Sequence, residues 1–368
     1  MGSTRKRIAL FLPTLAGGGV ERGMVSLAQG FAERGHSVDL VLSKAEGPYL
    51  SKVPRKVRLV DLRASRVLTS LPGLVRYLKQ TRPAVMLSAA EHTNVVALWA
   101  RRLSKVPTRV IVNVCTTVSQ NFQRTSLIRE RCLPFFAYCF YPWADEIVAV
   151  SYGVADDLSR FIGLSRQRIR VIYDPVVTPS LLSLAHAPLD HSWFSPENSP
   201  VILGVGRLTV EKDFPTLVRA FACIRARRPV RLVILGEGRE RSRIELLIRE
   251  LGVDSDVSLP GFVANPYAYM ARAAVFVLSS IWEGLPGVVI EAMACGTPVV
   301  CTNCPSGPAE ILENGKYGRL VPTENVDALA EAISSTLDTR SNPEFLRQRA
   351  SVFTVENSLD QYLKLFRV

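Results

Sequence analysis

Residues 273–302 read AAVFVLSSIWEGLPGVVIEAMACGTPVVCT and contain one complete strand–helix–strand unit. Residues 273–280 form an apolar run of the length of a buried strand, and Pro286 suits the first turn of a helix that we expect to end at Cys295. The run PVVCT (298–302) predicts a second strand. Because two strands joined by one helix are parallel, this stretch predicts a parallel sheet with helices on its faces.

The same alternation of strands and helices runs through the chain in two series. The first series has apolar runs at 7–13, 37–43, 84–90, 109–114, 146–151 and 168–175, with a helix over Val20–Arg34. The second series adds runs at 201–208, 231–238 and 257–262, with helices over 214–228 and 239–251. Residues 178–200 are rich in Pro and Ser and have no periodicity, which predicts a linker.

The two series predict two Rossmann-like, doubly wound α/β domains. We expect an N-terminal domain over 1–180, a C-terminal domain over 181–350, and a final helix within 351–368 that returns to the first domain. A chain of 368 residues is also longer than one hydrophobic core usually supports. Open parallel sheets bind ligands at the carboxyl ends of their strands, so we expect the domains to face each other across a cleft.

The charged residues are distributed unevenly between the two halves. Residues 1–180 hold 26 Lys and Arg against 12 Asp and Glu, whereas residues 181–368 hold 19 against 21. The basic first half therefore favours an anionic partner. Seven cysteines without the spacing of a secreted domain argue against a disulfide framework. No apolar stretch approaches the ~20 residues of a spanning helix, so we expect a cytoplasmic protein, with a peripheral place on the inner face of the cell membrane as one alternative.

Two carboxylates flank the turn that precedes the helix of the opening stretch. Glu283 and Glu291 lie eight residues apart, with Gly-Leu-Pro-Gly between them. The free N–H groups of Gly287 and Val288 at the helix start make a site for a phosphate or sugar oxygen. Glu291, two turns later, can accept hydrogen bonds from a ribose diol. Either glutamate alone could be a cap, but the pair favours a binding site.

Two cations and a glycine cluster follow the first strand of each predicted domain. Arg207 and Lys212 lie in GVGRLTVEKDF (204–214), and a guanidinium with an ammonium suits a diphosphate. The alternative is two solvated surface charges. Gly17–Gly19 allow a phosphate to approach a helix start, or form a simple turn. They do not match the dinucleotide fingerprint, since Arg22 stands where the third glycine should fall.

Five segments, in this order and spacing, resemble the retaining glycosyltransferases of family 4, which have the GT-B fold: AGGGVERG, GRLTVEKDFPTLVRAF, GEGRERSRIE, LPGF and EGLPGVVIEAMACGTPVV. The resemblance covers nearly the whole chain and is strongest over 201–322. It implies a hexosyltransferase of bacterial polysaccharide or glycolipid assembly. The donor would be a nucleotide sugar, with uridine diphosphate as the expected nucleotide, and neither a metal nor another cofactor is expected.

The resemblance also implies roles for individual residues. Arg207 and Lys212 hold the diphosphate, Glu283 contacts hydroxyls of the donor sugar, and these three form the catalytic set. Glu291 contacts the ribose. The remaining implied contacts are Leu285, Gly287 and Val288 at the sugar and phosphate, Phe262 and Val263 at the base, and Gly18 and Gly19 over the phosphates from the first domain.

The chain departs from the family after the strand 109–114. Many members carry a His or an acidic residue there, whereas this chain has Cys115, Thr116 and Thr117. His92, after another strand, is a candidate acceptor-side or sugar-contacting residue, against the alternative of a plain polar residue at a strand end. Because no nucleophile is evident, attack from the face that the leaving phosphate occupies is the expected route.

Two further patterns resemble metal or redox sites. Asp254 and Asp256 spell an Asp-x-Asp pattern, but they fall in a loop before a strand, so we interpret them as a solvated turn and expect no metal site. Cys301 and Cys304 form a lone Cys-x-x-Cys pair, which cannot complete a zinc site without further ligands. We interpret both as core or loop thiols.

Two segments of the basic half interleave cations with apolar residues. Residues 51–83 and 124–143 fit a surface on anionic lipid, or apolar faces packed on the sheet with solvated charges. No nucleic-acid partner is expected, because the sequence has no recognisable DNA- or RNA-binding motif. The predicted function is sugar transfer to a glycan or polyprenyl-diphosphate-linked acceptor. The alternatives are a soluble acceptor, a GT-B sugar-nucleotide epimerase and a nucleotide-binding module without turnover.

Overall fold

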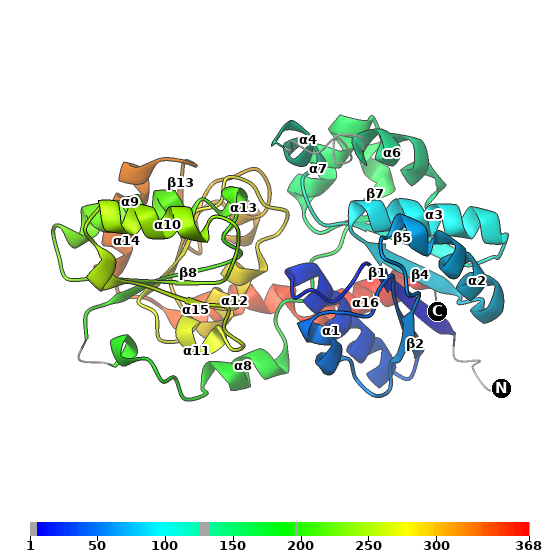
Figure 1. Cartoon of the computed structure of the whole chain (residues 1–368), viewed down its shortest axis with the longest axis horizontal. Helices are drawn as coiled ribbons and strands as arrows, with labels where there is room; N and C mark the ends of the chain where they lie inside the picture. Colours follow the sequence, from blue (N-terminus) through cyan, green and yellow to red (C-terminus); the bar gives the residue numbers. More distant parts are fainter. Residues whose placement is uncertain (1–5, 125–132, 196–197, 368) are drawn as a thin grey trace. The chain divides into compact units, whose positions relative to one another are not determined.

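The computed structural model describes residues 6–124, 133–195 and 198–367. The chain divides into two compact units. Unit 1 consists of residues 1–175 and 355–368, and unit 2 consists of residues 176–354 (Figure 1). The chain therefore passes from unit 1 to unit 2 once and returns once.

In the described part of unit 1, seven parallel strands form one sheet in the order β3-β2-β1-β4-β5-β6-β7. The strands are β1 (Arg7–Leu12), β2 (Ser37–Leu42), β3 (Arg58–Asp61), β4 (Val85–Ala89), β5 (Arg109–Val114), β6 (Glu146–Ala149) and β7 (Ile169–Val171). Strands are added on one side of β1 up to β3 and on its other side from β4 onward. The boundary between β1 and β4 is the topological switch point, where such sheets bind ligands.

Helices cover both faces of this sheet. On one face, α1 (Gly19–Glu33) packs against α16 (Val355–Phe366), with the Phe31 and Phe366 rings 5.3 Å apart. The other helices of unit 1 are α2 (Leu71–Thr81), α3 (Glu91–Ser104), α4 (Val118–Arg124), α6 (Leu133–Phe140) and α7 (Tyr152–Ile162). Because the sheet is covered on both faces, its central strands are almost entirely buried and largely apolar rather than alternating.

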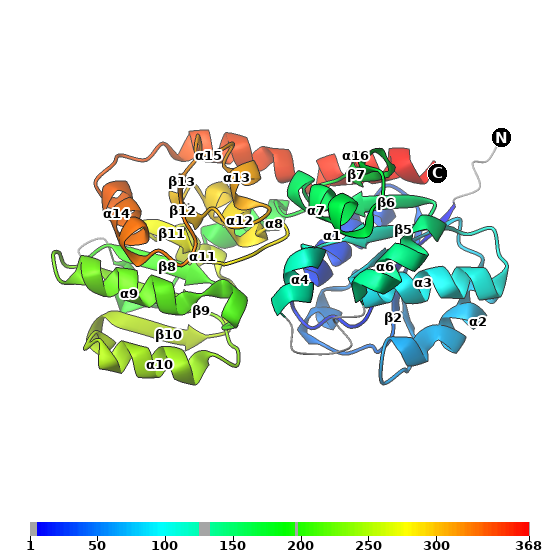
Figure 2. The ribbon, with the colours of Figure 1, turned by 90° about the horizontal axis from the view of Figure 1, so that it is seen from above.

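The described part of unit 2 repeats this design with a six-stranded parallel sheet in the order β10-β9-β8-β11-β12-β13 (Figure 2). The strands are β8 (Val201–Val205), β9 (Arg231–Leu235), β10 (Val257–Gly261), β11 (Val275–Leu278), β12 (Val299–Thr302) and β13 (Arg319–Val321). The switch point here lies between β8 and β11. The expected pair of doubly wound, parallel α/β domains is confirmed.

The helices of unit 2 also form two layers. One layer contains α9 (Phe214–Arg225), α10 (Arg241–Glu250) and α14 (Val326–Leu337), which pack on one another. The other contains α8 (Pro179–Ala185), α11 (Tyr267–Met270), α12 (Gly287–Cys295) and α15 (Pro343–Ala350), and the short α13 (Pro308–Ile311) follows β12. None of the described helices of either unit is both long and apolar enough to cross a membrane.

Three details differ from the sequence prediction. The predicted linker 178–200 contains α8, whose start is capped by the Thr178 hydroxyl and has Pro179 in its first turn. The short strands β3 and β13 were not predicted, because they have only four and three residues, include exposed arginines and form no apolar run. Helix α12 begins at Gly287, so Pro286 is its N-cap residue rather than its first helical residue.

The packing of α1 on α16 leads to a prediction about Gly30. A Cβ at this position would lie 2.2 Å from Cδ1 of the buried Leu359. Alanine normally stabilises a helix interior by up to about 1 kcal/mol relative to glycine, but overpacking costs about 1–3 kcal/mol. We therefore expect Gly30→Ala to destabilise the protein in chemical denaturation. In a Leu359→Ala background the same substitution should become neutral or stabilising, and additive effects would contradict this account.

Candidate active site at the switch point of unit 2

The loops that follow β8 and β11 meet at the switch point of unit 2, because these two strands are neighbours in the sheet. The first loop contains a 3₁₀ turn (Val210–Lys212) and ends at Asp213, whose side chain caps α9. The second loop runs from Ser279 to Pro286. The two loops are joined directly, since the N–H of Ile281 donates to the carbonyl of Glu211 over 2.8 Å.

An ion pair between Lys212 and Glu283 lies at the centre of this site. Lys212 Nζ is 2.6 Å from Glu283 Oε1, and the two side chains are only 16% and 12% exposed. The Ser280 hydroxyl donates to the same Oε1 over 2.7 Å. Two of the predicted site residues, 71 positions apart in the chain, are thus brought together by strand adjacency.

A close approach of two backbone segments fixes the start of the β8 loop. Gly236 follows β9 and has a φ of +138°, and a Cβ there would lie 1.9 Å from the carbonyl oxygen of Gly206. Only glycine combines this φ with this proximity. Gly206 is in turn held by a hydrogen bond from its N–H to the carbonyl of Leu235.

Arg207 lies at the same strand end but is not part of the ion pair. Its side chain is 78% exposed, and its guanidinium lies 3.8 Å from the carboxylate of Glu211. A flexible exposed arginine of this kind can reach a phosphate that binds beside Lys212.

The start of α12 carries no side-chain cap, because its N-cap residue is Pro286. Within the described residues, no hydrogen bond involves the N–H groups of Gly287 or Val288. Both residues and Leu285 are partly exposed. This helix end therefore has the free donors and the dipole that stabilise an anion.

Glu291 is buried beneath this helix start, with 4% of its surface exposed. The hydroxyl of Tyr267, from α11, donates to Glu291 Oε1 over 3.3 Å. Tyr267 was not singled out from the sequence, since no local pattern connects it to a glutamate 24 residues later. Phe262, which is exposed, and Val263 follow β10 at the same carboxyl edge of the sheet.

The predicted unit 1 residues lie beside the corresponding switch point of that unit. Gly18 is the N-cap of α1 and Gly19 its first residue, after a turn in which Gly17 has a φ of +105°. His92 is exposed and is the second residue of α3, directly after β4. β1 and β4 are neighbours, so both groups of residues lie at carboxyl ends of adjacent strands.

Acidic residues that the sequence analysis missed surround Cys115 in unit 1. Glu91 accepts a hydrogen bond from the Thr116 hydroxyl over 2.6 Å, so the carboxyl ends of β4 and β5 are linked. Burial, followed by the charges of Asp174 and Glu91, raises the pKa of the Cys115 thiol. Burial also raises the pKa of Asp174 to about 7.

The Asp-x-Asp and Cys-x-x-Cys patterns, which resemble metal or redox sites, make contacts that are typical of structural residues. Asp256 accepts a hydrogen bond from Arg225 over 2.8 Å and precedes β10, at the amino edge of the sheet, as does Asp254. Cys301 and Cys304 are free, buried thiols, and burial raises the pKa of Cys304 to about 12. Among the described residues, no group of three or more His, Cys, Asp or Glu side chains could hold a metal ion.

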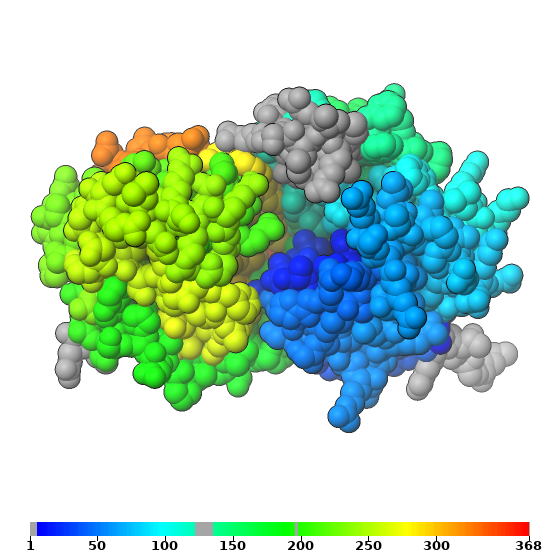
Figure 3. All heavy atoms as spheres, viewed as in Figure 1, coloured from blue at the N-terminus to red at the C-terminus, as the bar shows by residue number. Residues whose placement is uncertain are grey.

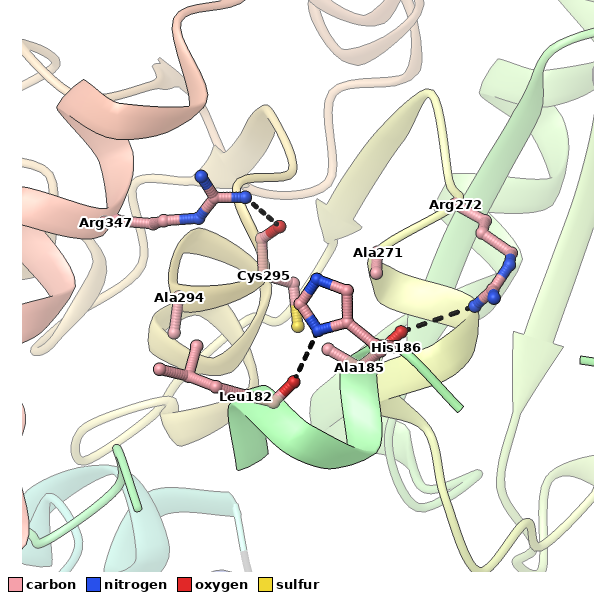
Figure 4. Close-up of a pocket in the computed structure, with 8 residues that line it drawn as sticks. All are labelled: Leu182, Ala185, His186, Ala271, Arg272, Ala294, Cys295 and Arg347. Atoms are coloured by element: carbon pink, nitrogen blue, oxygen red, sulfur yellow. Dashed lines mark hydrogen bonds between the residues drawn. The ribbon is translucent and has the colours of Figure 1, made fainter. Parts of the chain in front are cut away.

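A cavity of about 530 Å³ lies in unit 2 at the C-terminal ends of α8, α11 and α12 (Figure 4). Its cations bind carbonyl groups at these helix ends, with Arg272 donating to Ala268 and Arg347 to Cys295. His186 contacts the carbonyl of Leu182 in the same way. The charges of the two arginines offset the negative helix ends, and no predicted site residue lines this cavity.

The two basic segments of unit 1 differ in structure. In α2, Leu74, Tyr77 and Leu78 are buried and the helix packs on α3, so the apolar face of this segment belongs to the core. Residues 125–132 of the second segment lie outside the described residues. Its remainder, α6 and the following turn, exposes Phe135, Tyr138 and Trp143.

Family models match almost the whole chain. Residues 17–178 match the model of Glycosyltransferase Family 4, and residues 188–352 match the model of Glycosyl transferases group 1. The boundary between the two matches falls near the start of unit 2.

Two of the curated relatives are bacterial glycosyltransferases. The chain is 33% identical over 248 residues to an N-acetylgalactosamine-N,N'-diacetylbacillosaminyl-diphospho-undecaprenol 4-alpha-N-acetylgalactosaminyltransferase of Campylobacter jejuni, a match that covers 67% of this chain and 64% of that protein. It is 29% identical over 359 residues to the lipopolysaccharide core biosynthesis glycosyltransferase LpsE of Rhizobium meliloti, over 95% of both chains.

Solved structures share the fold of the whole chain. HepE of Anabaena, in complex with UDP-glucose, matches with a TM-score of 0.79 at 19% identity over 98% of this chain and 99% of that one.

The raised pKa of Asp174 predicts a pH dependence of stability. Between about pH 4 and pH 7 the folded state keeps a proton that the unfolded state releases, so stability falls as pH rises through this window. Asp174→Asn removes the effect and should stabilise the protein at pH 8 by about 1–2 kcal/mol, since partial exposure weakens the full effect. The gain in unfolding free energy should vanish by pH 4, and a gain that is independent of pH would contradict the assignment.

Proposed function

The chain belongs to the family 4 glycosyltransferases of GT-B fold, and from this premise we propose that it transfers a sugar from a UDP-linked donor to a lipid-linked glycan with retention of anomeric configuration. The observation that carries the proposal is the ion pair of Lys212 and Glu283 at the switch point of unit 2. In a nucleotide sugar, the diphosphate and the sugar hydroxyls are separated by a single glycosidic bond. A cation and a carboxylate 2.6 Å apart match these neighbouring groups.

The proposal assigns the remaining donor contacts to residues near this ion pair and at the same edge of the sheet. Arg207 reaches the diphosphate from its exposed position, and Leu285 with the backbone N–H groups of Gly287 and Val288 lines the sugar and phosphate site. Glu291, held by Tyr267, accepts hydrogen bonds from the ribose. Phe262 and Val263 lie against the base.

The chemical step needs stabilisation of the leaving diphosphate, which gains negative charge as the glycosidic bond breaks. Lys212, Arg207 and the start of α12 supply fixed positive charge and N–H dipoles for this purpose. Glu283 accepts a hydrogen bond from the sugar and orients it. The acceptor oxygen forms the new bond on the face that the diphosphate leaves, and its proton passes to the departing phosphate oxygen. Under this proposal no metal or other cofactor takes part.

The acceptor side is assigned to unit 1. Gly18 and Gly19 approach the phosphates, and the exposed His92 at the start of α3 contacts acceptor or sugar hydroxyls. The name of the Campylobacter relative describes a diphospho-undecaprenol glycan as acceptor, which supports a polyprenyl-diphosphate-linked acceptor for this chain. The net positive charge of residues 1–180 suits such an anionic substrate and an anionic membrane surface.

One surface of unit 1 has the composition of a membrane-contacting face. Its apolar residues are Leu103, Phe135, Tyr138 and Trp143, from α3, α6 and the turn after α6, and we call them the aromatic patch. Trp99 and Phe140 pack edge to face beneath it, with ring centroids 5.2 Å apart. Arg102 lies over the Trp143 ring, so cations adjoin the patch. These segments, coloured cyan to green, form part of the surface of unit 1 in Figure 3.

Lys212→Ala tests the donor site. Because it removes a cation that acts on the leaving diphosphate, we expect turnover to fall by roughly 10²–10³-fold. Release of nucleoside diphosphate from a panel of nucleotide sugars, with and without lipid-linked acceptor, measures this. Arg207→Ala should also lower turnover, whereas Arg243→Ala, at a comparably exposed arginine of α10, should leave it unchanged.

Several outcomes of the same panel would contradict the proposal. Turnover of Lys212→Ala within about threefold of wild type would reject the diphosphate assignment. Full activity is expected in excess chelator, and its loss would favour a metal site instead. Release that does not depend on the lipid would indicate a soluble acceptor, and a product that is the epimer of the donor would indicate an epimerase. No reaction with any donor would indicate a binding module.

Flotation with vesicles tests the membrane-contacting face. We expect binding to vesicles of phosphatidylglycerol and phosphatidylcholine, weakening as salt rises. The double variant Phe135→Ser/Tyr138→Ser should bind less, because it removes most of the exposed apolar area. Leu246→Ser, which removes an exposed apolar side chain of unit 2, is the matched control. A wild-type protein that stays unbound on anionic vesicles would reject the membrane proposal.

A further inference from the structure

Two buried serines at the end of β11 contact the two halves of the Lys212–Glu283 pair. The Ser280 hydroxyl donates to Glu283 Oε1 over 2.7 Å, and the Ser279 hydroxyl donates to the backbone carbonyl of Lys212 over 2.8 Å. Both side chains are almost completely buried. Neither hydroxyl can therefore touch a substrate, and each acts through the residue that it holds.

The contacts of Glu283 are unequal on its two oxygens. Oε1 accepts hydrogen bonds from both Lys212 and Ser280, whereas within the described residues Oε2 accepts none. A carboxylate whose one oxygen is fixed from two directions has its plane set, so the direction of its second oxygen is set too. The fixed orientation leaves Oε2 for a hydrogen bond from outside the protein.

Ser280 is itself held by a buried neighbour. The Thr302 hydroxyl, at the end of β12, donates to the backbone carbonyl of Ser280 over 2.5 Å. Thr302 and Ser280 are both fully buried, so a rigid sheet edge supports the carboxylate. Rigid support of this kind matters because a small misplacement of a contacting group lowers a reaction rate strongly.

We infer that Ser280 is a positioning residue that directs Glu283 Oε2 at a hydroxyl of the donor sugar, while Ser279 positions Lys212 for the diphosphate. This inference rests on the proposed function. Both serines are needed because Lys212 alone does not fix the orientation of the Glu283 carboxylate. Once a diphosphate binds, the Lys212 ammonium shares its N–H donors between the phosphate and the carboxylate. The neutral hydroxyl of Ser280 has no second acceptor of this kind and keeps Glu283 in place.

Calorimetric titration with UDP and with UDP-sugars separates the two serines. The probe is the sugar that wild type binds best among UDP-glucose, UDP-galactose and their N-acetylamino counterparts. We expect Ser280→Ala to weaken binding of this UDP-sugar by about tenfold and to leave UDP binding within twofold, since it disturbs a contact to the sugar. Ser279→Ala should weaken both ligands equally. Ser280→Thr keeps the hydroxyl, so it should keep the affinity for the UDP-sugar that Ser280→Ala loses.

Thr297→Ala is the matched control, because it removes another buried hydroxyl of unit 2 that donates to a carbonyl, that of Met270. It should change neither affinity. If Ser280→Ala folds poorly, Ser280→Cys supplies a group of similar size that donates weakly. If the Ser280 variants lose affinity for UDP and for the UDP-sugar equally, or lose affinity for neither, the inference is overturned but the proposed function is not. A wild-type protein that binds no UDP-sugar would overturn the proposed function, and the inference with it.

An unfolding cycle over Ser280→Ala and Glu283→Ala, each of which removes the hydrogen bond, tests the contact without a ligand. If the hydroxyl holds the carboxylate, the double variant should lose less unfolding free energy than the two single variants together. Additive losses would show that the hydrogen bond does not form in solution and would overturn the inference.

Discussion

The ion pair between Lys212 and Glu283 joins two loops that leave the sheet of unit 2 at its switch point, and the rest of the site is arranged around it. The pair exists because β8 and β11 are neighbours in the sheet, although 69 residues lie between the end of β8 at Val205 and the start of β11 at Val275. The strands β9 and β10, which the chain forms in between, lie on the far side of β8. A partly buried pair of this kind is costly to desolvate unless further hydrogen bonds satisfy it. The Ser280 hydroxyl supplies one to Glu283 Oε1, whereas Ser279 and the Ile281–Glu211 backbone bond hold the backbone of the two loops.

Unit 1 and unit 2 use the same sheet topology for different chemistry. The switch point of unit 2 presents a cation, a carboxylate and a free helix start within one polar site. That of unit 1 presents glycines, an exposed histidine and half-buried acids, although residues 1–180 carry most of the positive charge. Some of these cations, such as Arg102 and Lys79, are exposed to solvent.

The buried strands could be predicted from the sequence, because each of them is an apolar run. Elements that are only partly buried were missed. β3 and β13 have exposed residues and no apolar run. α8 was missed because the Pro and Ser residues of its segment predicted a linker. Thr178 followed by Pro179 is a helix-start signal that could have identified α8. The sequence pointed to Lys212 and Glu283 separately. The roles of Ser280 and Tyr267 could not be found in it, because a buried hydroxyl finds its partner only after the strands are placed side by side.

The helix α16 makes unit 1 discontinuous along the chain, whereas unit 2 is one continuous segment. During synthesis on the ribosome, all of unit 2 emerges before α16 does. Until then α1 lacks the helix that packs on its residues Gly30 and Phe31, so this face of α1 stays uncovered. The residues of unit 2 are therefore all synthesised before the last residues of unit 1, although domains are usually completed in order from the N-terminus. A chain that stopped before residue 355 would therefore contain all of unit 2 but an incomplete unit 1.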